Sequence, residues 1–179
     1  MDMNEQLRLA FQQFQHLWKQ DTFPSKTLLL KEGDIARKIF YIKKGCLRTW
    51  FNHDGKEISF QFFFEGDAVA SVESFNKQTP SPYSIETIEP TEIRWVVAED
   101  LQQMRAHPLI NTYLMDRAID RQAAFIQHFF SFLRDTPKQR YQKLLSERPQ
   151  VIQRVPLQYI ASYLGITQVS LSRIRAQIK

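Results

Sequence analysis

The chain contains one cysteine in 179 residues, and this scarcity excludes several kinds of protein. Cys46 alone cannot form an internal disulfide, and a single thiolate holds neither a tetrahedral zinc ion nor an iron–sulfur cluster. The four histidines, His16, His53, His107 and His128, are scattered without the spacing of metal ligands. We therefore expect no metal site and no required cofactor.

Long apolar runs are also missing. No stretch approaches the roughly 18 consecutive apolar residues of a membrane span, and the N-terminal residues lack the charged-then-apolar pattern of a secretory signal. We therefore expect a cytoplasmic protein that does not bind a membrane. No serine, histidine, cysteine or carboxylate spacing resembles a catalytic triad or the metal site of a cupin-like enzyme, so we expect no enzymatic activity.

Acidic residues are almost absent from the C-terminal part of the chain. From Pro137 onward there are eight lysines and arginines and one acid, Glu147, which gives a net charge of +7. The residues before Pro137 have 16 bases and 18 acids, a net charge of −2. Positive charge concentrated in this way is typical of a surface that binds nucleic-acid phosphates.

The same basic segment has the pattern of a helix-turn-helix. Apolar residues recur at helical spacing from Leu157 to Leu164, after a proline that fits the first turn of a helix. Gly165 can adopt the left-handed backbone of a tight turn, and Thr167 can cap the next helix. In that second helix one face without negative charge suits the major groove of DNA. This face comprises Gln168, Ser172, Arg175 and Lys179.

The residues before this segment have two different periods. Residues 7–18 repeat at helical spacing, which predicts an N-terminal amphipathic helix. Short apolar runs between turn signals then predict strands of a small sandwich or barrel, with a hairpin at Asp54-Gly55. These runs are residues 27–30, 39–42, 47–51, 58–64, 83–88 and 93–97.

Past Pro108 the period is helical again as far as Arg134, with two apolar stripes. One stripe comprises Ile119, Ala123, Ile126, Phe130 and Leu133, and the other comprises Ala118, Phe125, Phe129 and Phe132. Two stripes indicate that one face packs on the chain itself and the other on a second copy, in a parallel dimer. We assign the second stripe to the dimer interface. The alternative is a single wide face of intramolecular core.

The order of these elements resembles the Crp/Fnr family of bacterial transcription regulators. The resemblance covers nearly the whole chain and is carried by residues 30–34 (LKEGD), 40–45 (FYIKKG), 64–67 (FEGD) and 160–175. It implies an α+β protein with an antiparallel β-roll of the jelly-roll, cyclic-nucleotide-binding type at 1–107, a dimerisation helix at 108–136 and an all-α helix-turn-helix domain at 137–179. Residues 140–149 and 155–161 look like the branch common in Bacteroidetes-type bacteria.

The resemblance implies a homodimer that binds a near-palindromic double-stranded DNA site and regulates transcription, with RNA polymerase as a further expected partner. Its half-sites lie about 34 Å apart, one helical turn. Arginine and glutamine can bind guanine and adenine through two hydrogen bonds each. Position by position, the expected DNA-binding residues are Thr167, Gln168, Val169, Ser170, Ser172, Arg173, Arg175 and Lys179.

The loop that follows Gly66-Asp67 in the predicted β-roll differs in sequence from the nucleotide-binding members of the family. Members that bind cyclic nucleotides hold the ribose with a glutamate and the phosphate with an arginine, and Glu73 is the expected counterpart of the first. No arginine or lysine lies between Lys77 and Arg94, and Ser81 stands near the arginine position. The phosphate would lack a strong charge-assisted partner. We expect that the effector is not cyclic AMP and that any unidentified small molecule binds at Ser71, Glu73, Ser74, Ser81 and Tyr83.

A second departure lies near the C-terminus, where residues 149–155 are too few for the β-wing of many relatives. A smaller number of phosphate contacts predicts a milder salt dependence of DNA binding, with a slope reduced by about 0.9 for each phosphate that the protein leaves untouched. The alternative function is a ligand-sensing or protein-docking roll whose DNA-binding motif is vestigial.

Overall fold

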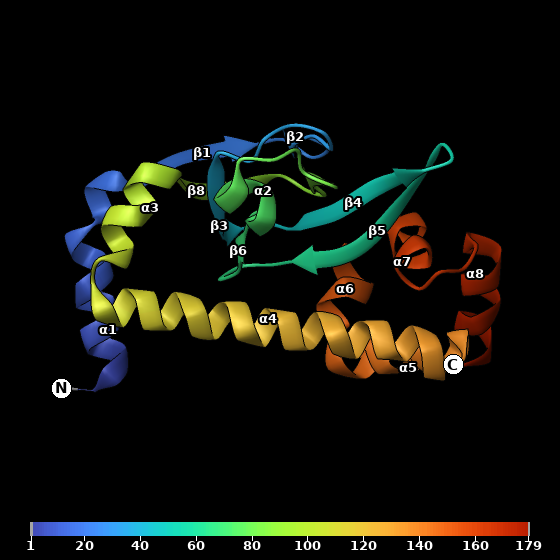
Figure 1. Cartoon of the computed structure of the whole chain (residues 1–179). Coiled ribbons are helices and arrows are strands. Elements are labelled where there is room, and N and C mark those ends of the chain that lie inside the picture. The colour runs from blue at the N-terminus through green and yellow to red at the C-terminus, as the bar shows by residue number, and fades with distance from the viewer. Residues whose placement is uncertain (1, 179) are drawn as a thin grey trace.

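The computed structural model describes residues 2–178. An N-terminal helix leads into a β-roll, and one long helix then runs the length of the molecule to a group of short helices at the other end (Figure 1). The helices are α1 (Met3–Gln13), η1 (Gln15–Leu17), α2 (Val72–Lys77), α3 (Ala98–Arg105), α4 (Pro108–Arg134), α5 (Pro137–Glu147), α6 (Pro149–Arg154), α7 (Leu157–Tyr163) and α8 (Gln168–Gln177). The strands are β1 (Lys19–Phe23), β2 (Leu28–Leu30), β3 (Lys38–Lys44), β4 (Leu47–His53), β5 (Lys56–Phe63), β6 (Ala68–Val69), β7 (Ser84–Thr87) and β8 (Thr91–Val97).

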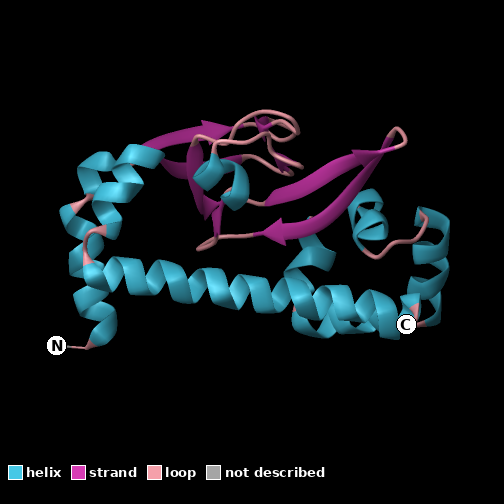
Figure 2. Ribbon diagram, viewed as in Figure 1, coloured by secondary structure: helices cyan, strands magenta, loops and turns pink. Residues whose placement is uncertain are grey.

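The strands form two four-stranded antiparallel sheets, in the orders β1-β8-β3-β6 and β2-β7-β4-β5. Figure 2 shows the sheets stacked above α4. Side chains of β3 alternate between buried and more exposed positions, as expected when one face of a sheet is buried, and Phe40, Ile42, Ile85 and Ile93 are in the roll core. The predicted α+β fold with an antiparallel roll is confirmed.

The hairpin β4–β5 is the longest projection of the roll. Asp54 and Gly55 both have positive φ, 52° and 77°, as a two-residue hairpin turn requires. The pairing continues from His53↔Lys56 to Leu47↔Phe63, with one register shift next to Thr49. The hairpin predicted from Asp54-Gly55 is confirmed, and it reaches from the roll to α7 (Figure 1).

Helix α4 has 27 residues and begins at a proline in its first turn, as predicted. No helix among residues 2–178 is both long and apolar enough to cross a membrane. At its N-terminal end α4 contacts α1, where Phe11 meets Tyr113 edge to face at 5.7 Å between ring centroids.

The sequence patterns did not predict five elements of the structure: β1, β6, α2, α3 and α6. Strand β1 is almost wholly exposed and polar, because it lies at the edge of its sheet. Strand β6 has two residues and helices α2 and α6 have six each. Such short segments hold too few residues for a period to show.

Candidate nucleic-acid interface

Helix α8 presents one open face at the end of the molecule furthest from α1 (Figure 1). Leu171 is fully buried and Ile174 is half-buried, so the apolar stripe faces inward. The predicted residues Gln168, Val169, Ser172, Arg173 and Arg175 are all exposed. We call these five residues the exposed α8 face. It combines two cations with amide and hydroxyl groups and has no acid, a composition that can bind phosphates and base edges.

The two hydroxyls at the start of α8 have a different role. Thr167 accepts a hydrogen bond from the backbone N–H of Ser170 at 3.1 Å, so it is the N-cap as predicted. The Ser170 hydroxyl lies 2.9 Å from that of Thr167 and is half-buried. Ser170 therefore helps to close the cap rather than extending the exposed α8 face. Lys179, the last predicted DNA contact, lies outside the described residues.

The turn between α7 and α8 packs against Phe132 of α4 and Arg140 of α5. Gly165 has φ of 66°, and a Cβ added there would come within 2.7 Å of the Phe132 ring of α4. Arg140 donates through its Nη2 to the carbonyl oxygen of Leu164 at 2.9 Å, and its guanidinium lies over the Phe132 ring. Glycine is thus needed at position 165 for both its backbone conformation and its lack of a side chain.

The other side of the helix-turn-helix is docked on the hairpin. The Ser162 hydroxyl of α7 accepts from the backbone N–H of Ser59 and donates to the carbonyl of Glu57, both at 2.9 Å. Arg48, 1% exposed, lies beneath with its guanidinium 3.7 Å from the centre of the Tyr159 ring. Both α7 and β5 contribute to one hydrophobic core. It comprises Cys46, Phe62, Phe64, Tyr141, Leu144, Val151, Val155, Ile160, Ala161, Tyr163, Leu164 and Leu171.

The buried Arg48 charge is fully paired. Its Nη2 lies 2.5 Å from both Glu57 and Glu86, and its Nε donates to Glu86 at 2.6 Å. Ser59 accepts a further hydrogen bond at 3.3 Å. A buried cation without such partners would be strongly destabilising. No sequence pattern marked this residue, since a lone arginine in a strand is usually exposed.

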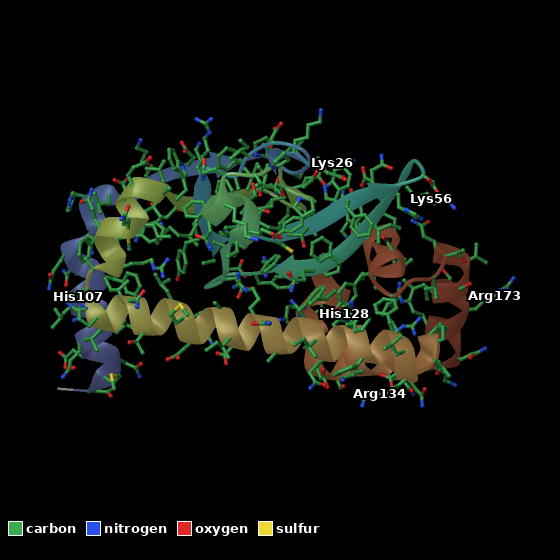
Figure 3. All side chains as sticks on the ribbon, in the orientation of Figure 1. Lys26, Lys56, His107, His128, Arg134 and Arg173 are labelled. Atoms are coloured by element: carbon green, nitrogen blue, oxygen red, sulfur yellow. The ribbon has the colours of Figure 1, made fainter. Side chains whose placement is uncertain are left out.

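Three basic residues of the C-terminal segment are engaged by the protein itself, two of them by the roll. Arg148 donates to the carbonyl of Phe62 at 2.7 Å, and Arg154 pairs with Glu65 at 2.7 Å and with Glu89. The third is Arg140 at the turn. The net charge of +7 therefore overstates the charge available to DNA, because these cations are engaged by the protein itself. The exposed cations of α8 are Arg173, at the end of the molecule in Figure 3, and Arg175.

His128 of α4 lies in the same junction. Its ring stacks on Tyr163 with 4.2 Å between centroids and meets the edge of Phe132 at 5.0 Å. Burial lowers the pKa of His128 from 6.5 to about 4, with further lowering by the nearby Arg148, Arg140 and Lys143. His128 is therefore neutral near pH 7 in the folded chain, where the helix-turn-helix packs on the hairpin.

The residues predicted for ligand binding are only partly brought together. Ser81 donates to the carbonyl of Tyr83 at 2.6 Å and lies 2.9 Å from the Ser71 hydroxyl, and Tyr83 donates to the carbonyl of Ala70 at 3.1 Å. Ser74 is buried between Ala36 and Thr79 through hydrogen bonds. The hydroxyls thus bond to the protein itself.

Glu73 does not join this group. It is exposed on α2 and pairs with Lys77 at 2.9 Å, which lowers its pKa. The structure instead brings Arg121 of α4 to the loop, where it donates to the carbonyl of Ala68 and lies 3.9 Å from Asp67. Beside it Phe60 packs on Tyr83 at 5.0 Å. Glu73 is therefore at the surface of α2, and the Arg121 cation is engaged by Ala68 and Asp67.

The contacts of α4 with its own chain do not follow either predicted stripe, and the dimer interface at Ala118, Phe125, Phe129 and Phe132 stays a prediction. Phe125 lies edge-on to Phe60 of the roll at 6.5 Å, and Phe132 lies behind Gly165. Ala118 and Phe129 are exposed. The stripe assigned to the own chain is also exposed, with Ile119 at 60% and Leu133 at 68%. The helix rests on its own chain along a narrow, partly polar line, which apolar periodicity does not detect. That line comprises Ile110, Leu114, Arg121, His128 and Ser131.

The architecture of the described residues is a β-roll, a long helix and a C-terminal helix-turn-helix. The sequence of residues 20–107 matches the cyclic nucleotide-binding domain family. No curated protein matches the chain.

Three solved structures share this fold over most of both chains. FixK2 from Bradyrhizobium japonicum is similar with a TM-score of 0.79 and 18% identity, covering 90% of this chain and 84% of that one. CLP from Xanthomonas campestris, a c-di-GMP responsive global regulator, has a TM-score of 0.72 and 18% identity, covering 96% and 91%. A regulator assigned to the crp/fnr family from Eubacterium rectale has 0.71 and 17%, covering 93% and 80%. The Bacteroidetes-type branch stays a prediction.

The position of His128 predicts a pH-dependent stability. Its pKa is lower in the folded chain, so between about pH 4 and 6.5 the unfolded chain binds a proton that the folded chain does not. The free energy of unfolding therefore falls as the pH falls through this window, and His128→Gln makes that slope shallower. Urea titrations of both proteins across the window measure it. His16→Gln, at an exposed histidine, leaves the slope unchanged, and an unchanged slope in His128→Gln contradicts the assignment.

Proposed function

We propose that this protein is a dimeric, sequence-specific regulator of transcription that binds a near-palindromic DNA site through α8. The observation that carries the proposal is the exposed α8 face. It is held at the end of the molecule by a capped N-terminus, a fixed glycine turn and a shared core. A helix presented in this way fits the major groove, which is about 12 Å wide.

The roles of individual residues follow from their chemistry. Gln168 lies in the first turn of α8 and can pair with an adenine edge, and Arg173 can bind guanine or a nearby phosphate. Val169, 62% exposed, can contact a thymine methyl group. Thr167, as N-cap, lies where backbone phosphate is usually held. RNA polymerase is the natural protein partner of a regulator bound at a promoter.

The dimer supplies the second α8. The apolar side chains along α4 remain exposed in one chain, and a second copy related by a two-fold axis would cover them. Two recognition helices would then lie about 34 Å apart, at successive major grooves. The segment from Pro149 to Arg154 is helix α6 rather than a hairpin. This supports a DNA-binding domain without a β-wing between α5 and α7.

The effector, where there is one, is a molecule other than cyclic AMP. Ser71, Ser81 and Tyr83 satisfy their hydrogen bonds within the loop, and Arg121 is paired with Asp67 and Ala68. A cyclic phosphate would have to displace these contacts before it met a cation.

Arg173 provides the test of DNA binding. Arg173→Ala is expected to weaken binding by about 5- to 150-fold, which corresponds to the removal of one bidentate base contact. Mobility-shift titration on an operator selected with the wild-type protein measures the change. Arg8→Ala is the matched control, because it removes the same charge from an exposed position on α1, at the opposite end of the molecule.

An equal effect of both variants would show that binding depends on overall charge rather than on α8. The alternative of a vestigial motif would be supported if the charge-reversed double variant, Arg173→Glu with Arg175→Glu, bound the operator as tightly as the wild type.

Cyclic AMP is expected to leave the thermal unfolding midpoint unchanged. A ligand present at 100 times its dissociation constant would add about 2.7 kcal/mol to the free energy of unfolding, which differential scanning fluorimetry would detect. A rise in the midpoint that depends on the concentration of cyclic AMP, in the millimolar range, would contradict this. It would show that the hydrogen bonds of Ser71, Ser81 and Tyr83 break when the nucleotide binds.

A further inference from the structure

The outer face of α4 has a regular order that neither predicted stripe describes. Met115, Ile119, Ile126, Phe129 and Leu133 are exposed by 49%, 60%, 41%, 54% and 68%, and Gln122 among them is also exposed. These six residues follow one another in steps of four, three, four, three and four. We call them the seam. Such steps are the a and d positions of a heptad repeat, which keeps one side of a helix against a partner helix.

Among residues 2–178 the seam side chains are left largely uncovered. The chain's own contacts with α4 lie on the other side of the helix, at positions such as Ile110 and His128. The seam is about 27 Å long, from the 18 steps of 1.5 Å between Met115 and Leu133. Among the described residues the next longest helices, α1 and α5, have 11 residues each, too few to cover it. A helix with the same repeat and the same length is α4 of a second copy.

Gln122 is the one polar residue of the seam, at its middle. Among residues 2–178 its amide makes no hydrogen bond. In a parallel dimer in register, the two Gln122 side chains meet on the two-fold axis, and each can donate to and accept from the other. An antiparallel pairing over the whole seam sets Gln122 against Ile126. A slip of one heptad sets it against Met115 or Phe129, so that a buried amide is left without partners.

We propose that Gln122 sets the parallel orientation and the register of the homodimer. This rests on the proposed function, because it assumes the dimer. A single polar residue in a coiled-coil core commonly fixes orientation and register in this way. The register matters for DNA binding because α8 lies beyond the end of α4, so the register sets the spacing of the two α8 helices. A slip of one heptad would move one α8 by about 10 Å relative to the other, away from the spacing of successive grooves.

Disulfide cross-linking tests whether the seam is the contact between the two copies, because Cys46 is buried and is the only cysteine of the chain. In the full-length protein, Gln122→Cys is expected to form a covalent dimer readily under mild oxidation, seen on a non-reducing gel. Gln127→Cys is the matched control, since Gln127 is exposed on the same helix about 140° away from Gln122, and it should cross-link far more slowly. Equal cross-linking of the two variants would overturn the seam.

A second measurement tests the amide itself. Ile119 and Ile126 are one heptad apart, so Ile119→Cys and Ile126→Cys chains with different tags form a mixed disulfide only when the helices slip. With Gln122 present the mixed product should be rare. Gln122→Leu should increase it severalfold, and no increase would overturn the role of Gln122 in register.

DNA binding is not a readout of these experiments, so their outcomes separate the two proposals. Sedimentation equilibrium of the wild type that showed only monomer would contradict the dimer of the proposed function. A dimer in which Gln122→Cys did not cross-link would contradict the seam alone.

Discussion

The C-terminal helices depend on a hydrophobic core that they share with the roll. Cys46, Phe62 and Phe64 come from the roll, and the remaining members come from α5 to α8. A helical unit this small buries little apolar surface of its own, which makes small domains marginally stable. Docking on the hairpin supplies further apolar surface, and the buried Arg48 at this junction is paired with Glu57 and Glu86. The position of α8 relative to the roll is thus a consequence of packing.

Much of the fold could be predicted because its elements have strong local signals. The long apolar period after Pro108 gave α4 its correct bounds, and Asp54-Gly55 marked the hairpin whose turn requires positive φ. Gly165 and Thr167 likewise marked the turn and cap of the helix-turn-helix. The edge strand β1 was missed because its residues are polar, and α2 and α6 because they are short. Sequence periodicity does not predict secondary structure where tertiary contacts determine it.

The candidate site was predictable only in part, for a related reason. The exposed α8 residues follow from helical geometry, but the partners of Arg140, Arg148 and Arg154 are distant in sequence. A count of charges could not show that these arginines are engaged internally. The loop of Ser71 and Ser81 was predicted as a pocket from its place in the chain, whereas its hydroxyls bond to one another. On α4, long apolar stripes hid the heptad spacing, which became visible once exposure was known.

We regard the roll as a platform that holds a DNA-binding helix, with α4 bringing two such helices together. Selection of binding sites from random double-stranded DNA with the full-length protein tests this most directly. We expect an enriched near-palindrome whose half-sites have centres about 10 base pairs apart or a multiple of one helical turn. An enriched single half-site without symmetry, or no enriched sequence at all, would contradict it.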